Sequence, residues 1–314
     1  MSKPNSLMLS RRAMMTGLAA LSGVALLKPP RAAAVGTLPF QAIAAMAFDG
    51  PALILASDRF WRSTDGGASW VAASDQDAGP VTALATHPQR PGRIYASRQS
   101  GGLIRSDDGG AGWRDAGKGL PAAAATAVTI AAQLPDTLYV AVRGDGLWSS
   151  KDAGDSWDFV MDRPYLAKAE RDVLTLASVN IATGMGGDWI YAGTDLGLIR
   201  VPDCFCRWQG VDDPEAMAAL VKGQPTAPAQ PLPEGQALLS LALAPTSPET
   251  LYAGLQSGVW KSTDAGLRWA QVSDHPAPHL AVNPTDPNHV IAAADGAILS
   301  SRDGGVTWSA PAAV

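Results

Sequence analysis

The stretch Ser63-Thr64-Asp65-Gly66-Gly67-Ala68-Ser69-Trp70 decides the fold, because close copies of it recur along the chain. Four more copies keep the pattern Ser-x-Asp-x-Gly-x-x-Trp and begin at Ser106, Ser150, Ser262 and Ser301. A sixth copy, residues 201–208, keeps the Asp and the Trp but loses the Ser and the Gly. Self-similarity of this kind indicates a repeat architecture.

Each residue type in the motif has a physical reason. The Asp carboxylate can accept backbone N–H groups just ahead of it and close a tight turn. The Gly supplies a positive φ, and the Trp can bury a large area against a neighbouring repeat. The motif therefore predicts a hairpin between two strands, with structural roles for Asp65, Asp108, Asp152, Asp203, Asp264, Asp303, Trp70, Trp113, Trp157, Trp208, Trp269 and Trp308.

The flanking sequence repeats as well. Two short strand-like runs separated by a turn precede each motif, as in 81–85 and 93–97, and a third run leads into it. With the strand that leaves the Trp, each repeat holds four strands, a to d. The motif Trp residues are 43, 44, 51, 61 and 39 residues apart, which is the size of a propeller blade.

The sequence thus predicts an all-β fold, a single β-propeller of six blades with four antiparallel strands each. The expected blades are residues 37–78, 79–120, 121–162, 172–210, 237–273 and 276–314. A ring of seven blades would require a further blade in 209–236, and the proline content of that stretch disfavours strands.

Two insertions, 159–172 and 209–236, interrupt the regular spacing, and 213–222 has the pattern of a short helix. Both are d-to-a connections, so we expect both on the face opposite the motif hairpins.

The motif resembles the Asp-box, or BNR, repeat of a β-propeller superfamily that includes sialidases, xyloglucan hydrolases, sortilin-type receptors and photosystem II assembly propellers. The resemblance covers residues 37–314 and is specific for the fold. It says little about function, because these families share a scaffold and little else.

The N-terminus predicts export. Ser10-Arg11-Arg12-Ala13-Met14-Met15 resembles the twin-arginine motif, an apolar stretch follows, and Ala32-Ala33-Ala34 is a cleavage-site pattern. Residues 1–34 are therefore expected to be a signal peptide for the twin-arginine route, and the mature protein to be periplasmic or extracellular. An uncleaved membrane anchor is the alternative reading; a mature chain without this segment would not span a membrane.

Beyond residue 34 the chain has 19 basic and 29 acidic residues. This acidic balance argues against nucleic acid as a partner. Five arginines nevertheless fall in loops predicted to share one face, where they would suit a carboxylate, a phosphate or an acidic peptide. These candidate binding residues are Arg59, Arg98, Arg143, Arg163 and Arg171. Scattered, solvated arginines are the competing interpretation.

Cys204 and Cys206 are the only cysteines. Such a pair can form a disulfide, bind a soft metal or stay reduced. A local disulfide or a packing variant of the sixth motif is favoured. No metal site and no cofactor are expected.

The resemblance leaves catalysis open. A glycoside hydrolase needs two carboxyl groups flanking a sugar cleft. Candidates on the loop-rich face are Asp58, Asp145, Asp162, Glu170, Asp172 and Asp195, and their spacing favours no pair. No catalytic residue is therefore assigned. The favoured function is a non-catalytic, exported scaffold that binds a protein partner on the loop-rich face, and the alternative is a glycoside hydrolase of the Asp-box superfamily.

Overall fold

The computed structural model describes residues 38–40, 42–183, 187–211, 230–294 and 296–311. The chain divides into two compact units, residues 1–34 and residues 35–314. The expected signal peptide and the helix expected at 213–222 lie outside the described residues, so both stay predictions.

The second unit is built from β-strands, and its described residues contain no helix. Blade 1 consists of β1 (Ala45–Asp49), β2 (Ala52–Ala56), β3 (Arg59–Ser63) and β4 (Val71–Asp77), and blade 2 of β5 (Val81–Thr86), β6 (Ile94–Arg98), β7 (Leu103–Ser106) and β8 (Arg114–Asp115). Blade 3 consists of β9 (Ala125–Ile130), β10 (Leu138–Val142), β11 (Gly146–Ser150) and β12 (Asp158–Asp162), and blade 4 of β15 (Thr175–Val179), β16 (Trp189–Thr194), β17 (Gly197–Pro202) and β18 (Gln209–Gly210). Blade 5 consists of β19 (Ser240–Leu243), β20 (Leu251–Leu255), β21 (Gly258–Ser262) and β22 (Ala270–Ser273), and blade 6 of β23 (His279–Asn283), β24 (Asp286–Ala294) and β25 (Ala297–Ser301). A small hairpin, β13 (Tyr165–Leu166) and β14 (Ala169–Glu170), separates blades 3 and 4.

Within each blade the strands pair antiparallel with their neighbours in the sequence. Five blades have four strands. Blade 6 has three, and among the described residues its fourth strand is reduced to an isolated bridge between Ser300 and Ser309.

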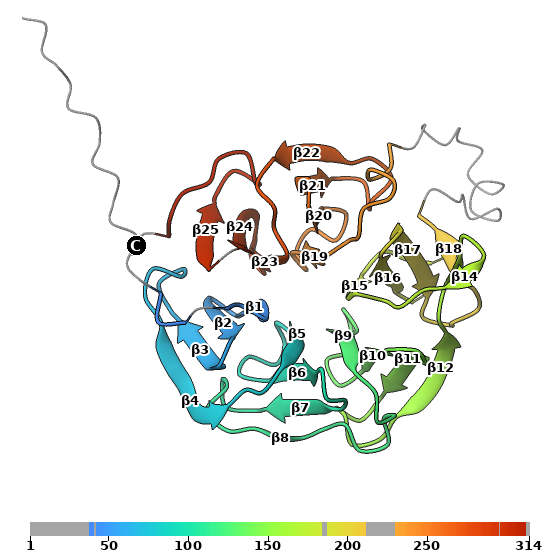
Figure 1. Cartoon of the computed structure of the whole chain (residues 1–314), viewed down its shortest axis with the longest axis horizontal. Helices are drawn as coiled ribbons and strands as arrows, with labels where there is room; N and C mark the ends of the chain where they lie inside the picture. The colour runs from blue at the N-terminus through green and yellow to red at the C-terminus, as the bar shows by residue number, and fades with distance from the viewer. Residues whose placement is uncertain (1–37, 41, 184–186, 212–229, 295, 312–314) are drawn as a thin grey trace, which may run out of the picture. The chain divides into compact units, whose positions relative to one another are not determined.

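The blades form a closed ring. The first strand of each blade lies innermost, and these six strands contact one another in the circular order β1, β5, β9, β15, β19, β23 and back to β1 (Figure 1). No sheet of the described residues combines strands from both ends of the chain, so side-chain packing joins blade 6 to blade 1. The predicted all-β, six-bladed propeller is confirmed.

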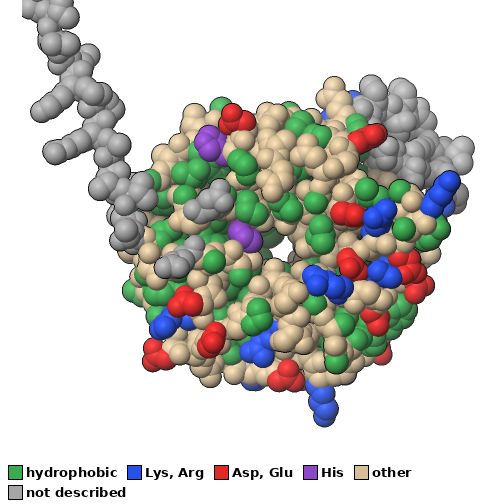
Figure 2. Space-filling view, in the orientation of Figure 1, with side chains coloured by type: hydrophobic (Ala, Val, Ile, Leu, Met, Phe, Trp, Pro, Cys, Tyr) green, Lys and Arg blue, Asp and Glu red, His purple; other side chains and the backbone are tan. Residues whose placement is uncertain are grey.

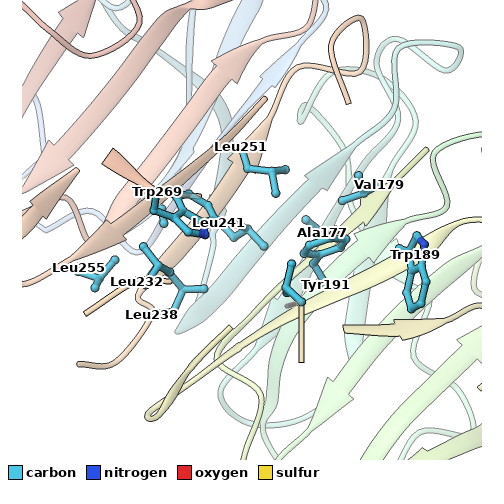
Figure 3. Packing of buried hydrophobic residues seen from close by; sticks show 12 residues of the cluster. Ala177, Val179, Trp189, Tyr191, Leu232, Leu238, Leu241, Leu251, Leu255 and Trp269 are labelled. Carbon is cyan, nitrogen blue, oxygen red and sulfur yellow. The ribbon is translucent and has the colours of Figure 1, made fainter. Parts of the chain in front are cut away.

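The hydrophobic core consists of six clusters, one between each pair of neighbouring blades. Each cluster includes the motif Trp of the later blade. Figure 3 shows the cluster between blades 4 and 5, where Trp269 of blade 5 lies with Leu238 and Leu251 near Tyr191 of blade 4. The expectation that the motif Trp packs against the neighbouring repeat is confirmed.

The recurrent aromatic residues of strands b and c also belong to these clusters. Tyr95, Tyr139, Tyr191 and Tyr252 of the b strands are buried, and three of their hydroxyls donate to carbonyl oxygens of the next blade. They are therefore packing residues, and a stacking platform for sugars is not needed to explain them.

Candidate functional site

Antiparallel strands divide the connections of every blade between two faces of the ring. We call the face with the a–b turns and the c–d turns the hairpin face, and the face with the b–c and d–a connections the loop face. Each eight-residue motif forms a c–d turn, which we call a repeat hairpin. All repeat hairpins thus lie on the hairpin face, as expected.

In a repeat hairpin the Asp carboxylate accepts hydrogen bonds from residues of its own turn. The Ser63 hydroxyl donates to Asp65 Oδ1 over 2.8 Å and accepts from the Gly67 N–H over 2.8 Å. The Ser69 N–H also donates to Asp65 Oδ1, over 2.9 Å. Trp70 Nε1 donates to the Gly67 carbonyl at 3.0 Å. The carboxylate therefore stabilises the turn, and its hydrogen bonds within the turn leave it poorly placed to bind a substrate.

The same hydrogen bonds recur at Asp108, Asp152, Asp264 and Asp303. Donation by a hydroxyl and an N–H of the same turn stabilises the ionised form. It lowers the pKa of Asp152 to about 2, with Ser156 as the main donor, and the pKa of Asp303 to about 2.

The degenerate hairpin of blade 4 is built differently. Asp203 accepts the Asp188 N–H over 3.2 Å instead of an N–H of its own turn. A disulfide joins Cys204 and Cys206, whose Cα atoms are 5.5 Å apart. Trp208 keeps its place in the core between blades 3 and 4.

The candidate arginines of blades 1 to 3 lie in the b–c connections of the loop face. Arg59 forms an ion pair with Asp58 at 3.3 Å, and both side chains are exposed. The Nε atom of Arg98 is buried without a hydrogen-bond partner among the described residues. Arg143 is exposed and forms no ion pair with a described residue.

The other two candidates flank the β13–β14 hairpin. Arg163 donates from both terminal nitrogens, to Asp172 at 3.3 Å and to Glu170. Arg171 pairs with Asp195 of the b–c loop of blade 4 at 3.0 Å. These two arginines are therefore braced by carboxylates, and this part of the surface has mixed charge. Figure 2 shows basic and acidic side chains interspersed on the displayed face.

The ion pairs and one further bond fix the hairpin to both neighbouring blades. Asp172 accepts the N–H of Gly144, in the b–c loop of blade 3, over 2.9 Å. The backbone N–H of Arg171 donates to the Pro164 carbonyl over 2.9 Å. The d–a connection after β12 is thus a built element of the loop face, beginning at Arg163.

The tip of this hairpin combines a strained turn with an exposed aromatic ring. Ala167 and Lys168 both have positive φ, 49° and 66°, which side-chain-bearing residues rarely adopt. Tyr165 is 69% exposed, whereas Leu166 packs against the core between blades 3 and 4. Strain of this kind persists where the surroundings hold the backbone.

The second insertion departs from the expectation. Gln230 donates to the Leu267 carbonyl at 3.0 Å and accepts from the Trp269 N–H at 2.9 Å. On the other side of 212–229, Val211 lies in the core cluster that contains Trp269. Both flanks therefore contact the repeat hairpin of blade 5, so the placement of this insertion on the loop face was wrong for its anchoring residues. The residues 212–229 themselves lie outside the description.

The ring encloses a central channel, whose opening is visible in Figure 2. A cavity of about 210 Å³ lies toward the hairpin face and is lined by a–b turn residues such as His87 and Pro284. A smaller cavity of about 100 Å³ lies toward the loop face. The two share a ring of aliphatic side chains, one from each inner strand: Met46, Leu84, Val128, Leu176, Leu241 and Leu280.

Sequence reasoning missed this channel. The available signal was an aliphatic residue that recurs in each inner strand. The residues that line the two cavities include no Asp and no Glu. His279 lies in the loop-face cavity, and burial lowers the pKa of its imidazole.

A charge network between blades 2 and 3 on the hairpin face was also missed. Arg93 bridges Asp107 and Asp136, and Arg105 donates to Asp107 at 2.6 Å. Arg105 and Asp107 are close in sequence, but Arg93 and Asp136 come from different blades, so spacing gave no sign of the network. The charges pair with one another and stabilise the junction.

Most candidate carboxylates of the loop face form hydrogen bonds or ion pairs with other side chains of the protein. Asp58 accepts Trp61 Nε1 at 3.2 Å, which lowers its pKa, the opposite of the shift that a general acid needs. Asp145 accepts Trp148 Nε1 at 3.0 Å. Glu170, Asp172 and Asp195 bind arginines, as described above, and Asp162 is exposed at the end of β12.

The described residues contain no group of three or more His, Cys, Asp or Glu side chains placed to bind a metal ion. They also contain no helix of the length and apolarity needed to cross a membrane.

Comparison with known proteins yields structural likeness only. No family model matches the chain, and no curated protein matches it in sequence. Among solved structures, the chain is similar to the GH74 enzyme of Niastella koreensis, with a TM-score of 0.62 and 15% identity over 88% of this chain and 46% of that one. The GH74 xyloglucanase of Xanthomonas campestris gives a TM-score of 0.53 and 20% identity over 84% and 45%. The chain thus spans less than half the length of these enzymes.

A smaller propeller is similar over most of its length. YCF48 from Cyanidioschyzon merolae gives a TM-score of 0.51 and 14% identity, covering 87% of this chain and 86% of that one. A YCF48 structure bound to a D1 peptide gives a TM-score of 0.50 and 17% identity over 87% and 83%. At these identities the likeness establishes the propeller fold and nothing finer.

Proposed function

We propose that this chain is a non-catalytic, exported scaffold that binds a protein partner on the loop face between blades 3 and 4. The observation that carries the proposal is the braced β13–β14 hairpin, which presents Tyr165 with 69% of its surface exposed. Tyrosine and arginine are the residue types enriched at the energetic centres of protein interfaces.

The bracing matters for affinity. A loop that must be ordered on binding loses part of the interaction energy to that ordering. Here Arg163, Arg171 and Asp172 already fix the hairpin to blades 3 and 4 in the free protein. The aromatic ring is therefore presented by a rigid support, as expected of a surface that recognises another protein.

Two further features of the proposal come from the sequence. We infer from the motif that the repeat hairpins are of the Asp-box type, and from Arg11-Arg12 with the following apolar stretch that the chain is exported by the twin-arginine route. A similar propeller, YCF48, has been seen with a bound peptide, which supports a search for a peptide or protein partner.

The glycoside hydrolase alternative draws on the likeness to GH74 enzymes. It requires two carboxyl groups roughly 5–10 Å apart beside a sugar cleft, one of them protonated near neutral pH. The cavities of the channel offer no carboxylate, and the candidate carboxylates named above, other than Asp162, are bound to arginine, tryptophan or backbone donors. These observations favour the scaffold.

Site-specific photo-crosslinking tests the proposal. A photoreactive phenylalanine analogue is placed at Tyr165 and, as a matched control, at Leu134, which is 59% exposed on the hairpin face of blade 3. In cells that produce the protein at native levels, position 165 should yield a discrete protein adduct that position 134 does not. No adduct at 165, or equal adducts at both, would refute the surface. Release of reducing sugar from polysaccharides by the purified protein would instead support the hydrolase.

A further inference from the structure

The degenerate hairpin of blade 4 carries the only cysteines of the chain on the molecular surface. Cys204 and Cys206 are both exposed and are joined by a disulfide that spans a single residue, Phe205. The other five repeat hairpins close this turn with hydrogen bonds and without a disulfide. The blade 4 turn is also held by backbone hydrogen bonds, because the Phe205 N–H donates to the Pro202 carbonyl over 2.8 Å and the Asp203 N–H donates to the Asp188 carbonyl over 3.0 Å.

The bridge is also poorly suited to stabilise the protein as a cross-link. The stabilisation that a disulfide gives by restricting the unfolded chain grows with the logarithm of the loop it closes, and this loop is minimal. The strands on either side are already aligned, because Trp189 pairs with Pro202 at the end of the β16–β17 ladder. Removal of the disulfide should therefore leave the propeller folded.

The middle residue of the disulfide loop has an unfavourable conformation. Phe205 has a φ of 52°, at the place where the other five hairpins have Gly with positive φ. A bulky residue is an outlier in the left-handed region. Its ring contacts Tyr139 at a centroid distance of 5.6 Å, within the core between blades 3 and 4. In the oxidised form the turn and the disulfide both restrict the backbone at Phe205, and reduction removes one of these two restraints, so the conformational cost is greatest in the oxidised form.

The charged residues next to the two cysteines in the sequence differ in sign. Arg207 follows Cys206, is exposed, and forms no ion pair with a described residue. Asp203 precedes Cys204 and is a carboxylate that accepts the Asp188 N–H. A neighbouring cation stabilises a thiolate and a neighbouring anion destabilises it. The Cys206 thiolate is therefore the better leaving group of the pair.

We propose that Cys204–Cys206 is an exchangeable disulfide that accepts two electrons from the dithiol of a thioredoxin-like protein. A thiolate of that protein attacks Cys204 Sγ, the Cys204–Cys206 bond breaks, and the Cys206 thiolate leaves beside Arg207. The second thiolate of the protein then attacks its own sulfur in the mixed disulfide and expels the Cys204 thiolate. The donor ends as a disulfide, and both cysteines of this chain end as thiols after taking up two protons.

Equilibration of the full chain with glutathione redox buffers tests the proposal, with acid quenching, alkylation and mass spectrometry as the readout. The disulfide should be half reduced within the range of these buffers, and the thermal unfolding midpoint of the reduced protein should match that of the oxidised one. A disulfide that resists millimolar glutathione, or whose reduction unfolds the protein, would make it a structural cross-link and overturn the proposal.

Three variants test the local argument. Phe205→Asn places a residue that tolerates positive φ at the strained position, and it should favour the disulfide about tenfold in the same buffers. Arg207→Gln should slow exchange about threefold, whereas Arg302→Gln, at an exposed arginine of the blade 6 hairpin, should not. A thioredoxin-like protein that lacks its second cysteine should be trapped on Cys204; trapping on Cys206 would contradict the assigned leaving group. These measurements are independent of any partner at Tyr165.

Discussion

Removal of one hydroxyl group, in Tyr191→Phe, should weaken the junction between blades 4 and 5. Tyr191 is fully buried, and its hydroxyl donates to the Ala265 carbonyl of the next repeat hairpin over 2.8 Å. Burial raises the pKa of Tyr191, so the hydroxyl keeps its donor proton at neutral pH. The substitution leaves the ring in place and leaves a carbonyl without this donor. Loss of one partner in a buried hydrogen bond costs about 1–3 kcal/mol.

The chain supplies its own control. Tyr139 occupies the corresponding place in blade 3 and is 5% exposed, but its hydroxyl forms no hydrogen bond with the described residues. Tyr139→Phe should therefore change the free energy of unfolding by less than about 0.5 kcal/mol. Tyr95→Phe should cost less than Tyr191→Phe. The Tyr95 hydroxyl donates to the Ala153 carbonyl at 3.1 Å, but Arg105 Nη1 donates to the same oxygen at 3.2 Å and remains in the variant.

Equilibrium unfolding in urea, followed by tryptophan fluorescence, measures these differences. The midpoint should fall for Tyr191→Phe at an unchanged slope, and the thermal midpoint should fall by about 2–6 °C for a protein of this size. Equal losses for Tyr139→Phe and Tyr191→Phe would show that the ring, and not the hydroxyl, responds to the substitution. That result would refute the view that the Tyr191 hydrogen bond links blade 4 to the repeat hairpin of blade 5.

Other perturbations test other parts of the structure. Replacement of Arg11-Arg12 by two lysines should leave unprocessed protein in the cytoplasm, which fractionation and immunoblotting would detect; normal export would refute the twin-arginine assignment. Because the pKa of Asp303 is lowered from 3.8 to about 2 by its turn, its stabilising contribution should be complete above pH 3.8 and be lost as the pH falls through 2. Thermal midpoints of the wild type and Asp303→Asn should therefore converge in acid, and parallel curves would count against this origin. Gly254→Ala would place a Cβ 1.9 Å from the backbone oxygen of Ala277, which precedes blade 6, and should lower the free energy of unfolding by about 2–4 kcal/mol. As a control, the Cβ of Gly50→Ala meets no atom within 4 Å, and this variant should lose about 1 kcal/mol. Equal losses of stability in urea would exclude a close approach at Gly254.

The sequence was most informative where one residue type has one physical use. Trp70 and its five counterparts recur at blade spacing because each seals a junction, so the number and order of the blades followed from them. Ala153 and Ala265 show the limit of this approach. They stand where other hairpins have Gly and still adopt φ values of 62° and 60°. The tyrosine hydroxyls of the preceding blades bind their carbonyls, and these contacts are non-local.

The candidate site was harder to predict, because charge pairing depends on which loops meet. Arg163 and Arg171 were predicted to share one face with three other arginines. The pairing of Arg163 with Asp172 within the same insertion, and of Arg171 with Asp195 from the b–c loop of blade 4, was not foreseen. The position of Gln230 beside Trp269 was not predicted for a similar reason. A long connection between two blades can contact the hairpin face before it reaches the next strand on the loop face.

The junction between blade 6 and blade 1 has a consequence for how such rings arise and can be altered. It relies on packed side chains such as Phe40, Leu53 and Ile291, as the five other junctions rely on theirs. Within the part of the chain that the structure describes, no strand is exchanged across it. Every sheet is therefore encoded by one uninterrupted stretch of polypeptide. A gene rearranged to begin at another blade would still specify each sheet whole, which makes circular permutation, and growth by tandem duplication, accessible without rebuilding any strand pairing.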